Sequence, residues 1–345
     1  MWLSAVIRYA VFPVLMALAV EPGMLPNVAQ PGSQSLPSLV QRLSEEGGDF
    51  DTDNLISNER SFLHVIPALK AAGVSGGAYI GVGPDQNFSY IAQIRPSIAF
   101  IIDIRRDNLL VHLLFKALFG LAHNRVEYAA LLTGRPAPDR ADTWREASLE
   151  RLVGYVDGAK PEGTDALQQL DRRVHDAVAA FGMPLSAADF ATIQRFHHTF
   201  IASGLSLKFE SRGRRPQAVY PTYRDLITAT DRAGHAWSFL ATEPDFQFVK
   251  SLEAQDLIVP VVGDLGGTHA LAAIGDHLLA RGTKVSAFYI SNIETYLYGN
   301  TASQFAKNVA RLPHDARSVI IRSTFQASVS SSSIQPINEF LAINR

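Results

Sequence analysis

Two glycines and an acidic residue stand at a spacing that suits a nucleotide-like cofactor. The stretch YIGVGPDQNF, residues 79–88, places Gly81 and Gly83 at the end of a short apolar run. Glycines let the backbone approach a ligand, and the N-terminus of a following helix would face it. Asp103 stands about 20 residues beyond the glycines, where a carboxylate can accept hydrogen bonds from ribose hydroxyls. The pattern therefore indicates a nucleotide lying across two adjacent strands.

The same residues also fit a purely structural role. Gly81 and Gly83 would then permit tight packing between strand and helix, and Asp103 would cap the following helix or pair with Arg105. A G-x-G pair alone does not separate the two interpretations, so both stay open at the level of the sequence.

The elements that would position these residues alternate between strand and helix. Residues 78–82 predict a short apolar strand, residues 88–94 a helix that Pro96 ends, and residues 97–103 a strand buried on both faces. The order strand, helix, strand makes the two strands parallel. Later apolar runs predict that the sheet continues through AWSFLA, DLIVPVVGD, KVSAFYI and SVIIRSTF.

Polar residues follow these apolar runs. In an open parallel sheet, ligands bind beyond the carboxyl ends of the strands, so residues at those ends are the candidates for a site. The first group follows the two early strands and the second follows the later ones: Gly81, Gly83, Asp85, Asn87, Asp103 and Arg105, then Asp264, Ser291, Asn292 and Arg322. We expect both groups to meet at one edge of the sheet.

The chain divides into four predicted parts. Residues 1–20 hold one charge and an apolar stretch that ends in a small-x-small pattern, which predicts a signal peptide or anchor; a frayed N-terminal helix is the alternative. Residues 21–50 contain several prolines and predict a linker. Residues 51–325 predict the α/β domain, with a helical insertion at about 135–215. Residues 326–345 predict a flexible tail.

Composition limits the possible partners. The chain has 345 residues, 47% of them hydrophobic, which is enough to bury a large core. Its formal net charge of −2 provides no general attraction to nucleic acid, and no span is predicted beyond the N-terminal segment. The chain contains no cysteine, no P-loop motif, no G-x-S-x-G and no H-E-x-x-H. We therefore expect a small-molecule ligand and no metal.

The glycine loop GVGPDQN, Asp103 and the later loop VVGDLGG together resemble the class I S-adenosylmethionine-dependent methyltransferases, in a bacterial branch. The resemblance covers about residues 76–108 and 238–325, and it makes VVGDLGG the loop after the fourth strand. It implies a Rossmann-like, mostly parallel sheet flanked by helices, with the helical insertion in the middle of the chain. It also implies S-adenosylmethionine bound by Gly81, Gly83, Asp85, Asn87, Asp103 and Arg105, with Asp264, Ser291 and Asn292 on the acceptor side.

This sequence departs from the family pattern at two places. Tyr79 and Asp85 stand where the family usually has an acidic residue and a third glycine, and Asp85 or Glu59 would have to replace that acid. The Asn/Asp-Pro-Pro-Tyr motif of amino-methylating members is absent after VVGD, so no acceptor is indicated. Two hypotheses follow: a methyltransferase-like protein of unknown acceptor, or an exported, non-catalytic binding or accessory protein that keeps the fold. The first suits the cytoplasm, and the second suits a cleaved leader and a periplasmic or secreted protein.

Overall fold

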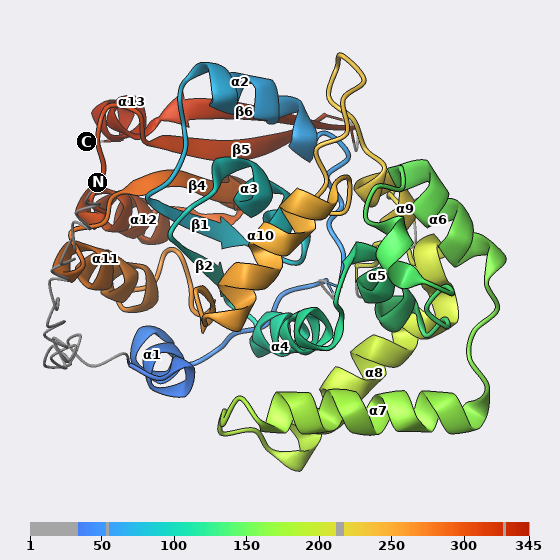
Figure 1. Cartoon of the computed structure of the whole chain (residues 1–345). Coiled ribbons are helices and arrows are strands. Elements are labelled where there is room, and N and C mark those ends of the chain that lie inside the picture. Colours follow the sequence, from blue (N-terminus) through green and yellow to red (C-terminus); the bar gives the residue numbers. More distant parts are fainter. Residues whose placement is uncertain (1–33, 53–54, 212–216, 327–328, 345) are drawn as a thin grey trace, which may run out of the picture. The chain divides into compact units, whose positions relative to one another are not determined.

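The computed structural model describes residues 34–52, 55–211, 217–326 and 329–344 (Figure 1). The predicted leader, residues 1–20, and the first part of the predicted linker lie outside the described residues. The strands are β1 (Ala78–Val82), β2 (Ile98–Asp103), β3 (Ile258–Val262), β4 (Val285–Ser291), β5 (Val319–Gln326) and β6 (Val329–Pro336). The α-helices are α1 (Leu36–Leu43), α2 (Ile66–Ala71), α3 (Gln86–Ile94), α4 (Arg106–Leu121), α5 (Arg125–Thr133), α6 (Leu149–Gly158), α7 (Thr164–Ala179), α8 (Ala187–Ser203), α9 (Tyr223–Ile227), α10 (Glu243–Ala254), α11 (Ala270–Ala280), α12 (Asn300–Arg311) and α13 (Ile337–Ile343). Short 3-10 helices are η1 (Phe62–Val65), η2 (Ala141–Trp144), η3 (Gly204–Ser206) and η4 (Ile293–Tyr296).

The described strands form one sheet in the order β3-β2-β1-β4-β5-β6. Strands β1 to β5 are parallel to their neighbours, and β6 runs antiparallel to β5. Every residue of β1 and β3 is buried, because helices cover both faces of the sheet and the continuous apolar runs can pack on either side. The prediction of an α/β fold with a mostly parallel, helix-flanked sheet is confirmed, and its order is that of a Rossmann-like fold.

The direction in which strands are added reverses between β1 and β4. From β1 the chain builds outward to β2 and then β3, and from β4 it builds the other way to β5 and β6. Helix α3 connects β1 to β2 on one face, where α4 and α10 also pack, and α11 and α12 precede and follow β4 (Figure 1). A crevice at such a reversal is the usual ligand position in an open α/β sheet.

A cluster of aromatic side chains joins α3 to the segments between β2 and β3. Phe88 on α3 meets Phe115 and Phe119 of α4 and Phe239 edge-on, with ring centroids 5.2–5.7 Å apart. Phe119 also stacks on Phe246 of α10 at 5.3 Å. Such edge-to-face pairs add to the free energy gained by burial. Helices α6, α7 and α8, which fall within the range predicted as an insertion, pack further out against α4 and α5.

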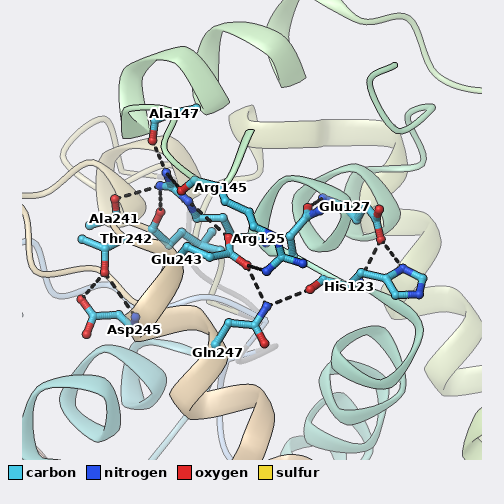
Figure 2. Close-up of polar contacts among 12 residues, drawn as sticks. His123, Arg125, Glu127, Arg145, Ala147, Ala241, Thr242, Glu243, Asp245 and Gln247 are labelled. Atoms are coloured by element: carbon cyan, nitrogen blue, oxygen red, sulfur yellow. Dashed lines mark hydrogen bonds and ion pairs between the residues drawn. The ribbon is translucent and has the colours of Figure 1, made fainter. Parts of the chain in front are cut away.

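Residues 106–133 form two helices, α4 and α5, with a short break between them. Helix α4 ends at Leu121, and Asn124 caps α5 by accepting a hydrogen bond from the backbone N of Glu127 at 3.0 Å. The next residue, Arg125, turns into the protein and meets the beginning of α10 (Figure 2). Its Nη1 donates to the carbonyls of Leu240 and Ala241, both at 2.8 Å, and its Nη2 donates to Ala147.

Glu243, at the start of α10, balances the buried charge of Arg125. Its carboxylate lies 3.7 Å from Arg125 Nε and 3.2 Å from Arg145 Nη1 (Figure 2). Thr242 caps the same helix, because its Oγ1 accepts a hydrogen bond from the backbone N of Asp245 at 3.2 Å. This polar network therefore fixes the angle at which the chain returns to the sheet before β3.

Three expectations from the sequence are wrong. The run AWSFLA is not a strand: Ala236 makes an isolated bridge to Thr230, and the chain then turns into α10, so VVGDLGG follows the third strand and not the fourth. The predicted linker contains α1, which forms because Leu36, Leu39, Val40 and Leu43 lie on one face and pack beside β3.

The third correction concerns residues 326–345, predicted as a flexible tail. They form β6 and α13, with Ser330 and Ser332 hydrogen-bonded to Ser61 and with Ile337 and Phe340 buried. The run of serines hides this strand, because it is paired on one side by the backbone and held by hydroxyls, without an apolar alternation. Among the described residues, no helix is both long and apolar enough to cross a membrane.

Candidate functional site

A cavity of about 330 Å³ opens at the carboxyl ends of β1 to β4, and we call it the strand-end cavity. Each of these strands contributes residues to its wall: Val82, Gly83, Pro84, Gln86; Ile102, Asp103, Ile104, Arg105; Gly263, Asp264, Leu265; and Tyr289, Ser291, Asn292, Ile293. Further wall residues come from three other segments: Phe50, Asp51, Thr52, Ser57, Asn58; Phe209, Ser211, Tyr220; and Tyr296, Leu297, Thr301. Gly83, Asp103, Arg105, Asp264, Ser291 and Asn292, all predicted from the sequence, thus surround one space.

Gly81 and Gly83 have different roles. Gly83 lines the cavity and has a φ of +84°, a left-handed conformation that favours glycine. Its carbonyl accepts a hydrogen bond from Nε2 of the buried His112 at 3.0 Å. Gly81 lies behind the wall, where an added Cβ would collide with Asn87 Oδ1 and with the Tyr79 ring. The first glycine therefore makes room for internal packing, as the structural alternative requires, and the second shapes the cavity.

Asn87 points into the protein and holds the glycine loop. Its Nδ2 donates to the carbonyls of Val82 at 2.9 Å and Pro84 at 2.7 Å, and its Oδ1 accepts from the Tyr79 hydroxyl at 2.7 Å. It is fully buried and does not line the cavity. Asn87 therefore acts on the shape of the loop.

Asp85 is likewise buried behind the loop. Its Oδ2 accepts a hydrogen bond of 2.7 Å from the Tyr223 hydroxyl on α9. Burial raises the pKa of Asp85 to about 7, although the Tyr223 hydrogen bond opposes the shift. The carboxyl group that was expected to contact a cofactor instead links the loop to α9.

Asp103 and Arg105 form a pair in the cavity wall. The backbone N of Arg105 donates to Asp103 Oδ1 at 2.9 Å, and its Nε lies 3.2 Å from the same oxygen. Arg105 Nη1 also donates to Thr52 Oγ1 at 2.6 Å, and only 7% of Arg105 is exposed. The pairing expected under the structural alternative is present, and Asp103 still lines the cavity.

Asp264 follows β3 on the same side of the cavity as Asp103, because β2 and β3 are neighbours. Its Oδ1 accepts from the backbone N of Gly266 at 2.8 Å, and its own backbone N donates to Glu45 Oε1 at 2.8 Å. The charged residues among those that line the cavity are Asp51, Asp103, Asp264 and Arg105. The wall therefore carries more negative than positive charge, which favours a cationic ligand.

Ser291 ends β4 in a left-handed conformation, with a φ of +55°. This conformation is costly for a residue with a Cβ, and it coincides with an irregular register between β4 and β5. The hydroxyl of Ser291 donates to the carboxylate of Glu59, and the hydroxyl of Ser323 donates to the other Glu59 oxygen. Burial raises the pKa of Glu59, although these hydroxyls lower it.

Several residues of the site escape sequence reasoning. The sequence offers Glu59 only as a replacement for the family's acidic residue, and no local pattern shows that it reaches the end of β4. The aromatic wall residues come from segments far apart in the chain: Phe50, Phe209, Tyr220, Tyr289 and Tyr296. Arg322, predicted at the same edge, does not line the cavity and pairs with Glu294 at 3.1 Å. Among the described residues, no group of three His, Asp or Glu side chains could hold a metal ion.

The mostly parallel α/β sheet defines a Rossmann-like protein, and its cavity lies at the strand reversal, where open α/β sheets usually bind ligands. Within that class, the chain belongs to the family described as "Domain of unknown function (DUF7790)", whose model matches residues 55–151 and 193–340. The match includes all the described strands and leaves out residues 152–192, which fall in α6, α7 and the start of α8. No curated protein matches the chain.

Proposed function

We propose that the strand-end cavity binds S-adenosylmethionine and that the chain is a methyltransferase-like protein. One observation carries this proposal: the cavity lies at the reversal of strand order and joins the Gly83 loop, Asp103 and the end of β4. A nucleoside across β1 and β2 would meet Gly83 and Asp103. The far side of the cavity, at Ser291 and Asn292, would then hold the methyl acceptor.

The charge of the cavity supports a cationic cofactor. S-adenosylmethionine carries a sulfonium, an ammonium and one carboxylate, so its net charge is positive at neutral pH. Asp51, Asp103 and Asp264 outnumber Arg105 among the charged wall residues. A methyl transfer needs mainly alignment of the acceptor with the sulfonium methyl group, which a rigid cavity can supply by proximity.

Asp103 can serve a ribose while it is paired with Arg105. Arg105 donates to both oxygens of the Asp103 carboxylate, from Nε to Oδ1 at 3.2 Å and from Nη2 to Oδ2 at 3.4 Å. A carboxylate offers about four lone-pair positions, so it can accept more than one hydrogen bond at each oxygen. The guanidinium also fixes the orientation of the carboxylate before the ligand arrives, which lowers the entropic cost of binding.

The Asp103–Arg105 pair also favours a second function. A positive guanidinium beside the expected ribose position weakens the attraction of the wall for a cationic cofactor. This suits a non-catalytic binding or accessory protein that uses the same cavity for another small molecule. Its expected export depends on residues 1–20, which lie outside the described residues.

Thermal unfolding of the full chain with S-adenosylmethionine or S-adenosylhomocysteine tests the first function. A ligand at 100 times its Kd stabilises the folded state by about 2.7 kcal/mol, so the Tm should rise by several degrees. Asp103→Asn keeps the size of the side chain and should abolish most of the rise. Asp276→Asn makes the same chemical change on α11, where the side chain is exposed, and should leave the rise intact. A wild-type Tm that neither compound moves would exclude the proposed function.

A further inference from the structure

Glu59 is a fully buried carboxyl group whose hydrogen-bond partners are hydroxyls. Ser291 donates to one oxygen and Ser323 to the other, and the Tyr289 hydroxyl is a further partner. The exposed fraction of Glu59 is 0%. A buried carboxylate is costly unless it is paired with a cation, and hydroxyl donors compensate only part of that cost. The carboxylate form of such a group is therefore a stronger proton acceptor than an exposed carboxylate.

The two oxygens of Glu59 face different surroundings. The Ser323 hydroxyl lies 3.1 Å from that of Ser332, which is 3.0 Å from the Ser61 hydroxyl. These serines come from β5, β6 and the segment before η1, so the oxygen bonded to Ser323 belongs to a closed structural network. The other oxygen is bonded to Ser291, which lines the strand-end cavity. The carboxyl group is therefore one hydroxyl away from a ligand in the cavity.

The position of Ser291 is held by the backbone. A left-handed residue at the end of a strand persists only where the surroundings determine it, and such residues are frequent at functional sites. The Ser291 hydroxyl can donate to Glu59 while its lone pairs accept a hydrogen bond from a ligand. This arrangement is that of a proton relay.

The wall next to Ser291 is aromatic. Helix η4 begins two residues after Ser291 and ends at Tyr296, whose ring meets Phe50 edge-on at 4.9 Å. Tyr289 lies two residues before Ser291 on β4 and also lines the cavity. Aromatic walls favour a flat, apolar ligand, and a polar group at one point orients it.

We propose that the methyl acceptor is a small phenol whose hydroxyl binds Ser291 and whose proton passes through Ser291 to Glu59. This inference rests on the proposed function. The phenol oxygen attacks the sulfonium methyl carbon, the carbon–sulfur bond breaks, and its electron pair stays on sulfur as a thioether. The phenol proton moves to Ser291 Oγ as the Ser291 proton moves to Glu59. The products are an aryl methyl ether, S-adenosylhomocysteine and a protonated Glu59, which then loses its proton to water.

The surroundings of Glu59 suit this role. The burial that raises its pKa makes the carboxylate a stronger proton acceptor, and a general base works best when its pKa approaches the operating pH. The ionisable groups around it are phenols: burial first and the charge of Glu59 second raise the pKa of Tyr90 and Tyr289. These tyrosines therefore stay neutral and do not compete for the proton.

The probe for this inference is 4-nitrophenol, whose ionised form absorbs visible light. Wild-type chain with S-adenosylhomocysteine should bind it, and the bound probe should ionise at lower pH than the free probe. 4-Nitroanisole, which lacks the hydroxyl, should show no dependence on Ser291. With S-adenosylmethionine, the wild type should form 4-nitroanisole, and Ser291→Ala or Glu59→Gln should lower the rate by about 10²-fold.

Ser323→Ala is the matched control, because it removes the donor from the other oxygen of Glu59. A merely structural role for these serines would change the ionisation of the probe equally in Ser291→Ala and Ser323→Ala, and that result would overturn the relay. Absence of 4-nitrophenol binding, in a chain that S-adenosylhomocysteine stabilises, would overturn the inference and leave the proposed function standing. Absence of stabilisation by S-adenosylhomocysteine would exclude both. Glu59→Gln can fail to fold, and the comparison of the two serine variants decides the question without it.

Discussion

Arg125 and Glu59 are both buried charges, yet their surroundings differ. Arg125 is enclosed by backbone carbonyls and balanced by Glu243, and it joins α5, α10 and the segment after η2 (Figure 2). Glu59 has hydroxyl partners and lies beside Ser291, whose backbone is left-handed. The buried charge of Arg125 is compensated by Glu243 and by carbonyls, whereas Glu59 is a buried carboxyl group held by hydroxyls next to a cavity. We therefore expect the region around Arg125 to stabilise the fold, and the region around Glu59 to hold the group on which the proposed proton transfer depends.

The largest expected effect is that of removing Arg125. Arg125→Ala leaves Glu243 buried beside the space that the arginine occupied and leaves several carbonyls without donors. The free energy of unfolding should therefore fall by about 3–5 kcal/mol. Arg145→Ala is the control, since Arg145 contacts the same Glu243 with a side chain that is 41% exposed and should cost no more than about 1 kcal/mol. Urea midpoints at constant m-value measure both. Equal losses in the two variants would show that Arg125 contributes no more to the compensation of Glu243 than Arg145 does.

The next effect concerns pH and Asp85. Because burial raises the pKa of Asp85 from 3.8 to about 7, the folded chain keeps a proton that the unfolded chain releases. This contribution to stability is fully present below pH 3.8 and is lost as the pH rises through 7. Asp85→Asn cannot titrate, and its amide oxygen can still accept from Tyr223. The free energy of unfolding of Asp85→Asn minus that of the wild type should therefore be larger at pH 8 than at pH 4, by on the order of 3 kcal/mol.

Urea unfolding at a series of pH values between 4 and 8 measures this difference. Glu253, whose pKa burial also raises to about 7, gives the same trend in both proteins and cancels from the comparison. Asp276→Asn, at an exposed position, should run parallel to wild type. If Asp85→Asn also runs parallel, Asp85 titrates normally and the loop behind the cavity carries no buried charge.

The smallest effect distinguishes Gly81 from an ordinary helical glycine. Gly81→Ala places a Cβ against Asn87 and Tyr79 and should cost about 1–3 kcal/mol through overpacking. Gly120→Ala on α4 meets nothing within 4 Å and should stabilise the chain by about 0.5–1 kcal/mol. Thermal unfolding compares them. A neutral Gly81→Ala would mean that the loop behind the cavity is loosely packed.

The sequence predicts the sheet where apolar runs end in polar residues. Those runs gave β1 to β5, and the rule that ligands lie beyond carboxyl ends identified Gly83, Asp103, Asp264 and Ser291 as neighbours. The same rule could not predict which side chains point into the cavity. Asp85 and Asn87 lie close to Gly83 in the chain, and only their hydrogen bonds with Tyr223 of α9 and Tyr79 of β1 show that they face away from the cavity.

The sequence fails where long-range hydroxyl contacts replace hydrophobic periodicity. β6 has serines at positions where a strand usually shows β-branched residues, and Ser61 provides their partners from the other end of the chain. The sequence does not reveal the contacts of Glu59 for the same reason, because its partners on β4 and β5 are distant in sequence. AWSFLA shows the opposite error: an apolar run that fills the aromatic cluster around Phe239 without forming a strand.

The path of the chain between β2 and β3 affects how the protein folds. Ala99 pairs with Ile258, so these adjacent strands cannot align until the intervening helices have closed a very long loop. The entropy of closing a loop grows only with the logarithm of its length, so the equilibrium cost is modest, whereas folding slows markedly when contacts are this distant in sequence. During synthesis β1 and β2 emerge long before β3. The edge of β2 that pairs with β3 in the folded protein therefore stays exposed until β3 has been made. A chaperone that shields this edge would shorten the interval in which the nascent chain can aggregate.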